Sequence, residues 1–238
     1  MSNFGALTDH FGFADTDWRL QSTSKTARSE NAQCENSFGD VEAEKVFDTG
    51  NNFECVYEVI KGQVEDTASG VEAGEIAWPA TLKGGTIVGD TGSGIVITGA
   101  TVETSQTERP RVTVTGEDIG NADSTGFAVY DFDLPSIKAV KQAQAMGFTP
   151  GGNTRVTSAT LSCTVEMAAT QDSQGERVAG DVHGGRVEGT GDLVACDTEP
   201  TATADTGFEL SGPIEVSQEN TDYGTASISV FKNILRDT

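Results

Sequence analysis

The feature that most constrains this chain is the alternation of apolar and polar side chains in short segments. Residues 53–60 are the clearest case, because Phe53, Cys55, Tyr57 and Val59 stand at odd positions and share one face, while Glu54 and Glu58 share the other. A period of two places the odd side chains on one face of an extended strand. The segment therefore predicts a β-strand with one buried face.

Similar segments recur along the chain, separated by residues that favour turns. Glycine occurs 28 times in 238 residues, and it disfavours helices because it loses the most backbone freedom on ordering. Residues 36–40 and 49–52, and the Asp-Thr-Gly sites that begin at Asp48, Asp90 and Asp205, are interpreted as turns. We expect strands at residues 17–26, 76–78, 86–88, 94–98, 111–115, 154–169, 176–182, 185–194, 207–216 and 223–234.

One segment departs from this pattern and predicts a helix over about residues 134–146. Pro135 stands in its first turn, helix-forming residues follow, and Gly147 and Pro150 come after its expected end. The whole pattern predicts a mainly β fold, an antiparallel β-sandwich or barrel with one short flanking α-helix. We expect residues 1–238 to form a single domain, since 24.9 kDa is enough for one large core.

Acidic residues dominate the charge of the chain. It has 37 Asp and Glu against 15 Lys and Arg, which gives a net charge of -22. Proteins that grip nucleic acid neutralise phosphates with clustered basic side chains, so the composition argues against specific DNA or RNA binding. Residues 62–75 are rich in glycine and carry Glu65, Asp66, Glu72 and Glu75 without a basic residue, and they predict an exposed acidic loop.

The spacing of Cys34, Cys55, Cys163 and Cys196 matches no zinc motif. Neither a secretory leader pattern nor an apolar run of bilayer length occurs in the sequence. We therefore expect mostly buried thiols in a reducing cytoplasm and no membrane partner. The alternative is a pair of local disulfides, Cys34–Cys55 and Cys163–Cys196.

Residues with catalytic potential are scattered. His183 and Asp181 would share one face of a strand and Ser162 would complete a triad with them, but a turn histidine is the favoured interpretation. Residues 89–94 have the composition of a phosphate-binding glycine loop, yet a strand follows them where such a loop needs a helix. Residues 118–123 lack the ligand spacing of a calcium loop. We therefore expect no enzyme, no cofactor and no metal.

A weak internal repeat links residues 38–46 with residues 174–182. Each segment follows a Ser/Thr-rich strand and precedes a strand interrupted by glycine. Duplication of a β unit would explain this similarity. Unrelated segments in which a turn joins two strands often have similar residues, and this would explain it equally well.

Several parts of the chain resemble bacteriophage tail tube proteins. The opening strand at residues 20–32 leads into a polar turn at residues 36–40, and residues 159–166, 171–176 and 212–230 are similar again. The resemblance covers about half of the chain. It implies a virion structural protein, with six copies in a ring and rings stacked into a hollow tube. Viral DNA would pass through the lumen without specific binding, since an acidic wall repels it.

The same resemblance implies a location and partners. The protein would assemble in the host cytoplasm and reside in the virion tail, where it would contact copies of itself and other tail proteins. The acidic loop and the residues after it would form the ring-to-ring contact. The candidate contact residues are Glu65, Asp66, Glu72, Glu75, Ile76 and Trp78.

Two other classes of function stay open. A tail terminator, a head-tail connector or a capsid decoration protein would also be small, rich in strands and symmetric in assembly. An extracellular carbohydrate-binding β-sandwich would use Trp18, Trp78 or His183 around a concave pocket. A halophilic host would explain the acidity as a means of solvation, and it is compatible with the tail tube interpretation.

Overall fold

The computed structural model describes residues 7–15, 17–60, 75–76, 78–88, 94–120, 127–132, 134, 137–138, 146–196, 198–218 and 223–235. All structural statements below concern these residues. The strands are β1 (Trp18–Glu35), β2 (Val41–Val59), β3 (Glu75–Ile76), β4 (Ile87–Val88), β5 (Ile95–Ser105), β6 (Arg111–Asp118), β7 (Ile137–Lys138), β8 (Phe148–Pro150), β9 (Thr154–Gln171), β10 (Arg177–Cys196), β11 (Ala202–Ala204), β12 (Glu209–Leu210), β13 (Glu215–Gln218) and β14 (Tyr223–Asn233).

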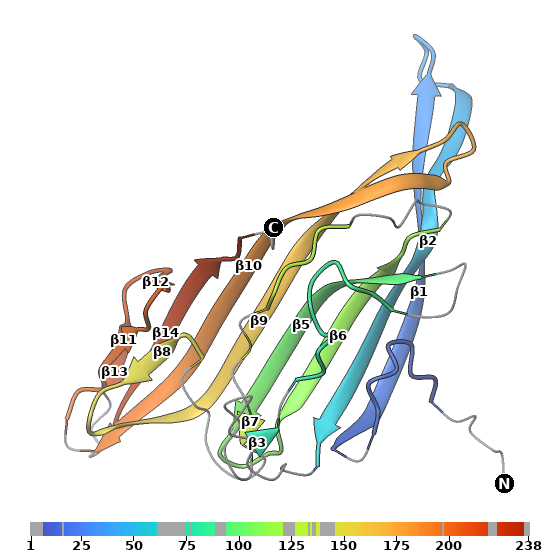
Figure 1. The fold of residues 1–238 in the computed structure, drawn as a ribbon. Coiled ribbons are helices and arrows are strands. Elements are labelled where there is room, and N and C mark those ends of the chain that lie inside the picture. Colours follow the sequence, from blue (N-terminus) through green and yellow to red (C-terminus); the bar gives the residue numbers. More distant parts are fainter. Residues whose placement is uncertain are drawn as a thin grey trace, which may run out of the picture.

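One large antiparallel sheet of ten strands dominates the fold (Figure 1). Its main path runs β1-β2-β6-β5-β9-β10-β14-β12, while β13 also pairs with β14 and β4 with β5. Two small sheets, β8 with β11 and β3 with β7, lie outside it. The mainly β, antiparallel prediction is confirmed. The closed barrel is not formed, because β1 borders one side of the sheet and β12 and β13 border the other.

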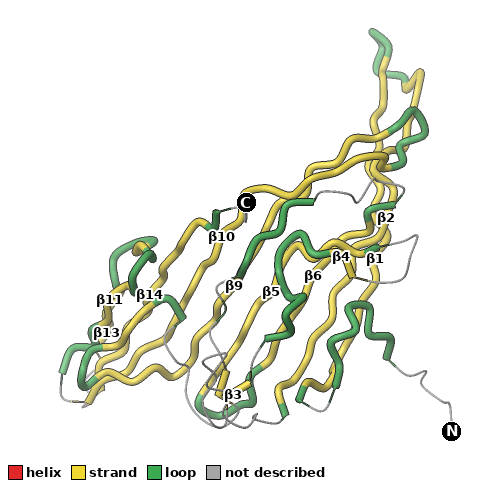
Figure 2. Tube along the Cα trace, viewed as in Figure 1, coloured by secondary structure: helices red, strands yellow, loops and turns green. Residues whose placement is uncertain are grey.

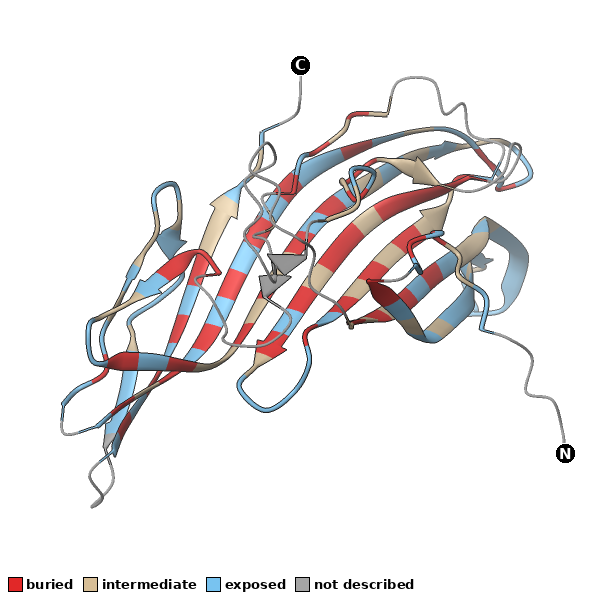
Figure 3. Cartoon of the chain, turned by 60° about the horizontal axis from the view of Figure 1, so that its bottom comes forward, coloured by how far each residue is buried: buried red, intermediate tan, exposed pale blue. Residues whose placement is uncertain are grey.

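The large sheet buries one face and exposes the other. Buried and exposed residues alternate along its long strands (Figure 3). On β14, Ala226, Ile228 and Val230 are buried, whereas Ser227 and Ser229 between them are exposed. This is the expected result of a period of two in a sheet that is covered on one side only.

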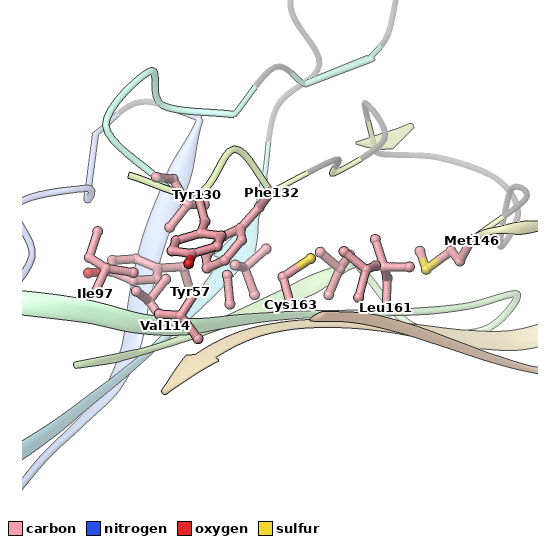
Figure 4. Packing of buried hydrophobic residues seen from close by; sticks show 14 of the residues in the cluster. Tyr57, Ile97, Val114, Tyr130, Phe132, Met146, Leu161 and Cys163 are labelled. Carbon is pink, nitrogen blue, oxygen red and sulfur yellow. The ribbon is translucent and has the colours of Figure 1, made fainter. Parts of the chain in front are cut away.

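Irregular segments rather than a second large sheet cover the buried face. Loops of the chain run across it in front of β5, β6 and β9 (Figure 2). Tyr130, Phe132 and Met146 from these segments lie on the same side of the sheet as Leu161 and Cys163 of β9, and all five are buried (Figure 4). Burial of apolar area in this layer supplies the main driving force for folding.

Glycines in β10 let the covering segments approach the sheet. A Cβ atom at Gly191 would lie 2.2 Å from the Phe148 ring, and one at Gly189 would lie 2.0 Å from the Met146 carbonyl oxygen. A side chain fits at neither position, which explains why a central strand carries residues that otherwise weaken strands.

The predicted strands are present, but several of their bounds differ. Residues 53, 55, 57 and 59 share the buried face as expected. Residues 49–52 lie inside β2 rather than in a turn, and the expected strands at 176–182 and 185–194 are one strand, β10. Residues 207–216 contribute only the short strands β12 and part of β13. Long-range pairing extended β2 and β10 through sequences that favour turns locally.

The predicted helix over residues 134–146 is not borne out by the described residues, which include no helix. Ile137 and Lys138 form β7 and pair with Glu75 and Ile76 of β3. Residues 135–136 and 139–145 lie outside the described residues. The pairing of β7 with a strand distant in the sequence overrides the local helix propensity.

The internal repeat corresponds to two hairpin turns of the same geometry. Asn36 Oδ1 accepts hydrogen bonds from the backbone N–H groups of residues 38 and 40. Asp172 Oδ1 accepts them from the equivalent residues 174 and 176. The third turn position is Gly39 in one hairpin and Gly175 in the other, with φ of 86° and 85°. The first residues of the repeat therefore coincide with two turns of the same chemistry.

The sheet register separates the cysteines that the disulfide alternative would join. Cys55 lies opposite Thr23 and Cys34 lies opposite Ala43, so roughly 35 Å of strand separates the two thiols. Disulfide geometry needs Cα atoms within about 7 Å. The four residues are present as thiols, with Cys34 and Cys196 exposed and the other two buried. The expectation of mostly buried thiols thus holds for one pair only.

Candidate functional site

The predicted contact residues fall in different settings. Glu65, Asp66 and Glu72 lie outside the described residues, as does the acidic loop apart from Glu75. Glu75 and Ile76 form strand β3. Trp78 is half-buried and packs against Trp18, with ring centroids 5.4 Å apart. The segment that follows the acidic loop therefore packs against the core through Trp78.

The residues considered for catalysis do not come together. His183 Nε2 lies 3.1 Å from Glu166 Oε2 at an exposed site on the second hairpin. Ser162 lies opposite Glu188, further along the sheet, and the Asp181 carboxylate accepts hydrogen bonds from backbone N–H groups. The sequence-based triad is thus not assembled.

The tryptophans do not form an exposed platform for a sugar. Trp18 is 4% exposed, and its ring packs against both Tyr57 and Trp78 in the core. Stacking of a sugar needs an accessible aromatic face. Trp18, one of the residues named for the carbohydrate-binding alternative, is therefore not accessible to a sugar.

Two hairpins extend beyond the body of the sheet (Figure 1). We define the first arm as residues 27–51. It comprises the turn between β1 and β2 and the parts of these strands that lie beyond the pairing of β2 with β6. We define the second arm as residues 165–185, beyond the pairing of β9 with β5 and of β10 with β14. The arms lie at the same end of the sheet.

An ion cluster joins the two arms to β6. Arg177 Nε lies 2.7 Å from Asp48 Oδ1, and Arg177 Nη1 lies 3.0 Å from Glu117 Oε2. Arg28 contacts the same two carboxylates, at 3.1 Å from Asp48 and 2.8 Å from Glu117. The charges of two guanidinium groups and two carboxylates thus balance at the place where β1, β2, β6 and β10 meet.

A bulge in β2 positions the central carboxylate of this cluster. The pairing of β1 with β2 shifts register between Arg28 and Glu30, and Asp48 in the bulge has a φ of 49°. Asp tolerates this left-handed conformation better than most residues. Gly50 leaves space beside it, because a Cβ there would lie 2.8 Å from Arg28 Nη2.

The cluster changes the acidity of Asp48 and Arg177. Hydrogen bonding from Arg177 lowers the pKa of Asp48 below its ordinary value, although burial acts in the opposite direction. Burial would lower the pKa of Arg177, but the bonds and charges of Asp48 and Glu117 outweigh it and leave the pKa raised. Both shifts favour the charged forms, so the pair of Asp48 and Arg177 is ionised over the physiological range.

A backbone contact adds to the ion cluster. Gly175, in the turn of the second arm, lies so close to the first arm that an added Cβ would be 2.8 Å from the Phe47 Cα atom. The two arms are therefore packed together near Phe47 and Asp48. The part of the first arm beyond this point carries exposed apolar residues, among them Phe38, Val41 and Val46.

The uncovered face of the sheet is polar and rich in hydroxyl groups. One row of cross-strand neighbours spans it from border to border through Ser22, Val56, Thr113, Thr101, Ser162, Glu188, Phe231 and Glu209. In a neighbouring row the Asp192 carboxylate accepts hydrogen bonds from Ser158 at 2.6 Å and Ser227 at 3.1 Å. The face is suited to water and ions rather than to an apolar partner.

The sequence pattern did not reveal the ion cluster. Asp48 and Arg177 are 129 positions apart, and neither stands in a motif. The only local signal was Asp-Thr-Gly at residue 48, which was interpreted as a turn. The equivalent interpretation at Asp205 is confirmed, since Gly207 has a φ of 87° in a turn, while the site at Asp90 lies outside the described residues.

Neither metal ligands, nor membrane-spanning helices, nor related proteins assign a function to this chain. In the part of the chain that the structure describes, no group of three potential metal ligands occurs. A search of the same residues for helical segments with the length and hydropathy of a membrane span found none. No known protein family matches the chain, and no curated protein does.

Proposed function

We propose that this protein is a structural subunit that assembles into rings, and that stacked rings form the tail tube of a virus. The observation that carries the proposal is the open sheet with its two unlike borders. In the described residues the outer edges of β1 on one side, and of β12 and β13 on the other, pair with no strand. Such edges invite pairing with another chain.

Strand direction supports closure into a ring. Every step along the path from β1 to β12 is antiparallel, and the path contains eight strands, so β1 and β12 run in opposite directions. A rotation that preserves strand direction would therefore place β1 of one copy antiparallel to β12 and β13 of the next. Repetition of this heterologous contact closes a ring when the rotation from one copy to the next is a whole-number fraction of a full turn.

The uncovered face suits the wall of a lumen. It carries carboxylates such as Glu54, Glu103 and Glu188 among serine and threonine hydroxyl groups. A wall of this kind would be hydrated and would repel DNA phosphates, so that a genome would slide along it without adsorption. The resemblance of the sequence to tail tube proteins supports a hollow tube of stacked rings.

Electron microscopy and sedimentation across a salt series test the proposal. Each subunit carries a net charge of -22, so assembly should increase as salt shortens the range of repulsion between subunits. Rings or tubes with a central channel are expected. A stable monomer at every salt concentration would contradict the proposal, and single rings that never stack would favour a tail terminator or connector.

A further inference from the structure

The first arm ends in an exposed aromatic residue. Phe38 lies in the turn between β1 and β2 and is 89% exposed. The ion cluster at Arg28 and Asp48 braces the arm, and the tip lies about 25 Å beyond this cluster by the rise of a strand. The chain thus holds a large apolar side chain in water at the end of a supported arm, and burial of such a group is favourable.

A cavity of about 700 Å³ lies between the starts of β9 and β14 and the end of β10. Its wall includes Gln106, Asn153, Arg155, Cys196 and Tyr223. The volume is within the range of about 300–1,000 Å³ that is typical of ligand-binding clefts. The described residues that line it include a single charged side chain, that of Arg155.

The tip and the cavity lie at opposite ends of the molecule. β1 and β9 run in the same direction, since four antiparallel steps separate them in the sheet. The tip follows the end of β1, whereas the cavity lies at the start of β9. A copy therefore cannot place its own tip in its own cavity, and any tip bound there belongs to a second copy.

We infer that the arm tip around Phe38 of one copy binds the cavity beside Arg155 of a second copy. The inference rests on the proposed function and deepens it, because a contact of this kind repeats along the strand direction and stacks one ring on the next. Phe38 enters the cavity, and the acidic flanks of the tip lie near Arg155.

The charges of the two surfaces are complementary. Residues 29–47 carry five carboxylates, Glu30, Glu35, Asp40, Glu42 and Glu44, and one basic side chain, Lys45. Arg155 is exposed and forms no ion pair with a described residue, although the chain as a whole is short of basic residues. Opposite charges steer two surfaces together and disfavour the alternative in which two acidic tips meet.

Two native thiols report on this contact. Cys34 stands two residues before the turn of the arm and is exposed, and Cys196 is an exposed residue of the cavity wall. Treatment of the assembled protein with a short bis-maleimide should link Cys34 of one copy to Cys196 of another. Mass spectrometry of the cross-linked peptides identifies the pair.

Single-cysteine variants separate the possible contacts. Cys34→Ser alone and Cys196→Ser alone should each give no cross-linked dimer, and a mixture of the two should give a dimer and no longer species. Dimers of Cys196→Ser alone would show that tip meets tip, and they would overturn the inference. Absence of any Cys34–Cys196 product from intact tubes would overturn it as well.

Phe38→Ala tests the energetic part of the contact. We expect loss of stacking, seen as tubes reduced to single rings, with an unchanged melting temperature because Phe38 makes no contribution to the core. Leu235→Ala is the matched control, since Leu235 is 85% exposed and lies away from both surfaces. Normal tubes from Phe38→Ala would contradict the inference alone, whereas failure of the native protein to assemble at any salt concentration would contradict the proposed function.

Discussion

Arg177 donates hydrogen bonds of 2.7 Å and 3.2 Å to the two carboxylate oxygens of Asp48, a residue 129 positions earlier in the chain. The two side chains are only 6% and 14% exposed, so the pair is shielded from water. It connects the second arm to the bulge of the first, and the remaining charges at Arg28 and Glu117 complete the balance. We therefore expect the support of the first arm to depend on this pair.

Replacement of Arg177 tests this dependence. Arg177→Ala leaves Asp48 and Glu117, which are 14% and 28% exposed, with one cation for two partly buried carboxylates, and loss of a hydrogen-bond partner at such a group costs about 1–3 kcal/mol. We expect a decrease of that size in the free energy of unfolding, measured in urea. Arg109→Ala is the control, because Arg109 is 58% exposed and 3.9 Å from Glu58, and it should cost less than about 1 kcal/mol. Equal effects of the two variants would disprove the structural role of the cluster.

The cluster also predicts the response to acid. The folded state lowers the pKa of Asp48 below the ordinary value of 3.8, mainly through its hydrogen bonds with Arg177. The stability that this provides is present above pH 3.8 and is lost as the pH falls through the folded pKa. Chemical unfolding between pH 6 and pH 2 should show this loss. In Asp48→Asn the slope of stability against pH should become shallower in that range, and an unchanged slope would argue against the assignment.

Two glycine variants test the contact between the two arms. Gly175→Ala introduces a Cβ at 2.8 Å from the Phe47 Cα atom at a φ of 85°, so it meets both a clash and backbone strain. Gly39→Ala meets the strain alone, because nothing lies within 4 Å at a φ of 86°. We expect Gly175→Ala to be the more destabilising by about 1–3 kcal/mol, and to increase protease cleavage of the first arm. The same loss from both variants would mean that the contact contributes nothing.

The acidic loop offers a test of assembly that is independent of the arm. Deletion of residues 64–74 removes Glu65, Asp66 and Glu72 but leaves Trp78 to pack against Trp18. The shortened protein should fold with a normal melting temperature and should fail to form tubes in sedimentation at any salt concentration. Normal tubes from this deletion would show that the loop is not the ring-to-ring contact.

The sequence by itself determined where the chain is extended and which face of each strand is buried. The alternation in residues 53–60 and 223–234 is sufficient for this, because side chains in a strand point to opposite faces in turn and only one face of the sheet is covered. Turn chemistry at Asn36 and Asp172 likewise fixed both hairpins locally. These are interactions between residues that are close in the chain.

The tertiary structure decided the order of the strands, the open borders and the joining of the arms. Residues 49–52 have the composition of a turn, yet pairing with β1 carries β2 through them and leaves only the bulge at Asp48. Ile137 and Lys138 lie in a segment with helix signals but pair with β3. In each case hydrogen bonds to a distant strand outweigh a local preference of about 1 kcal/mol or less, and such distant partners cannot be read from neighbouring residues.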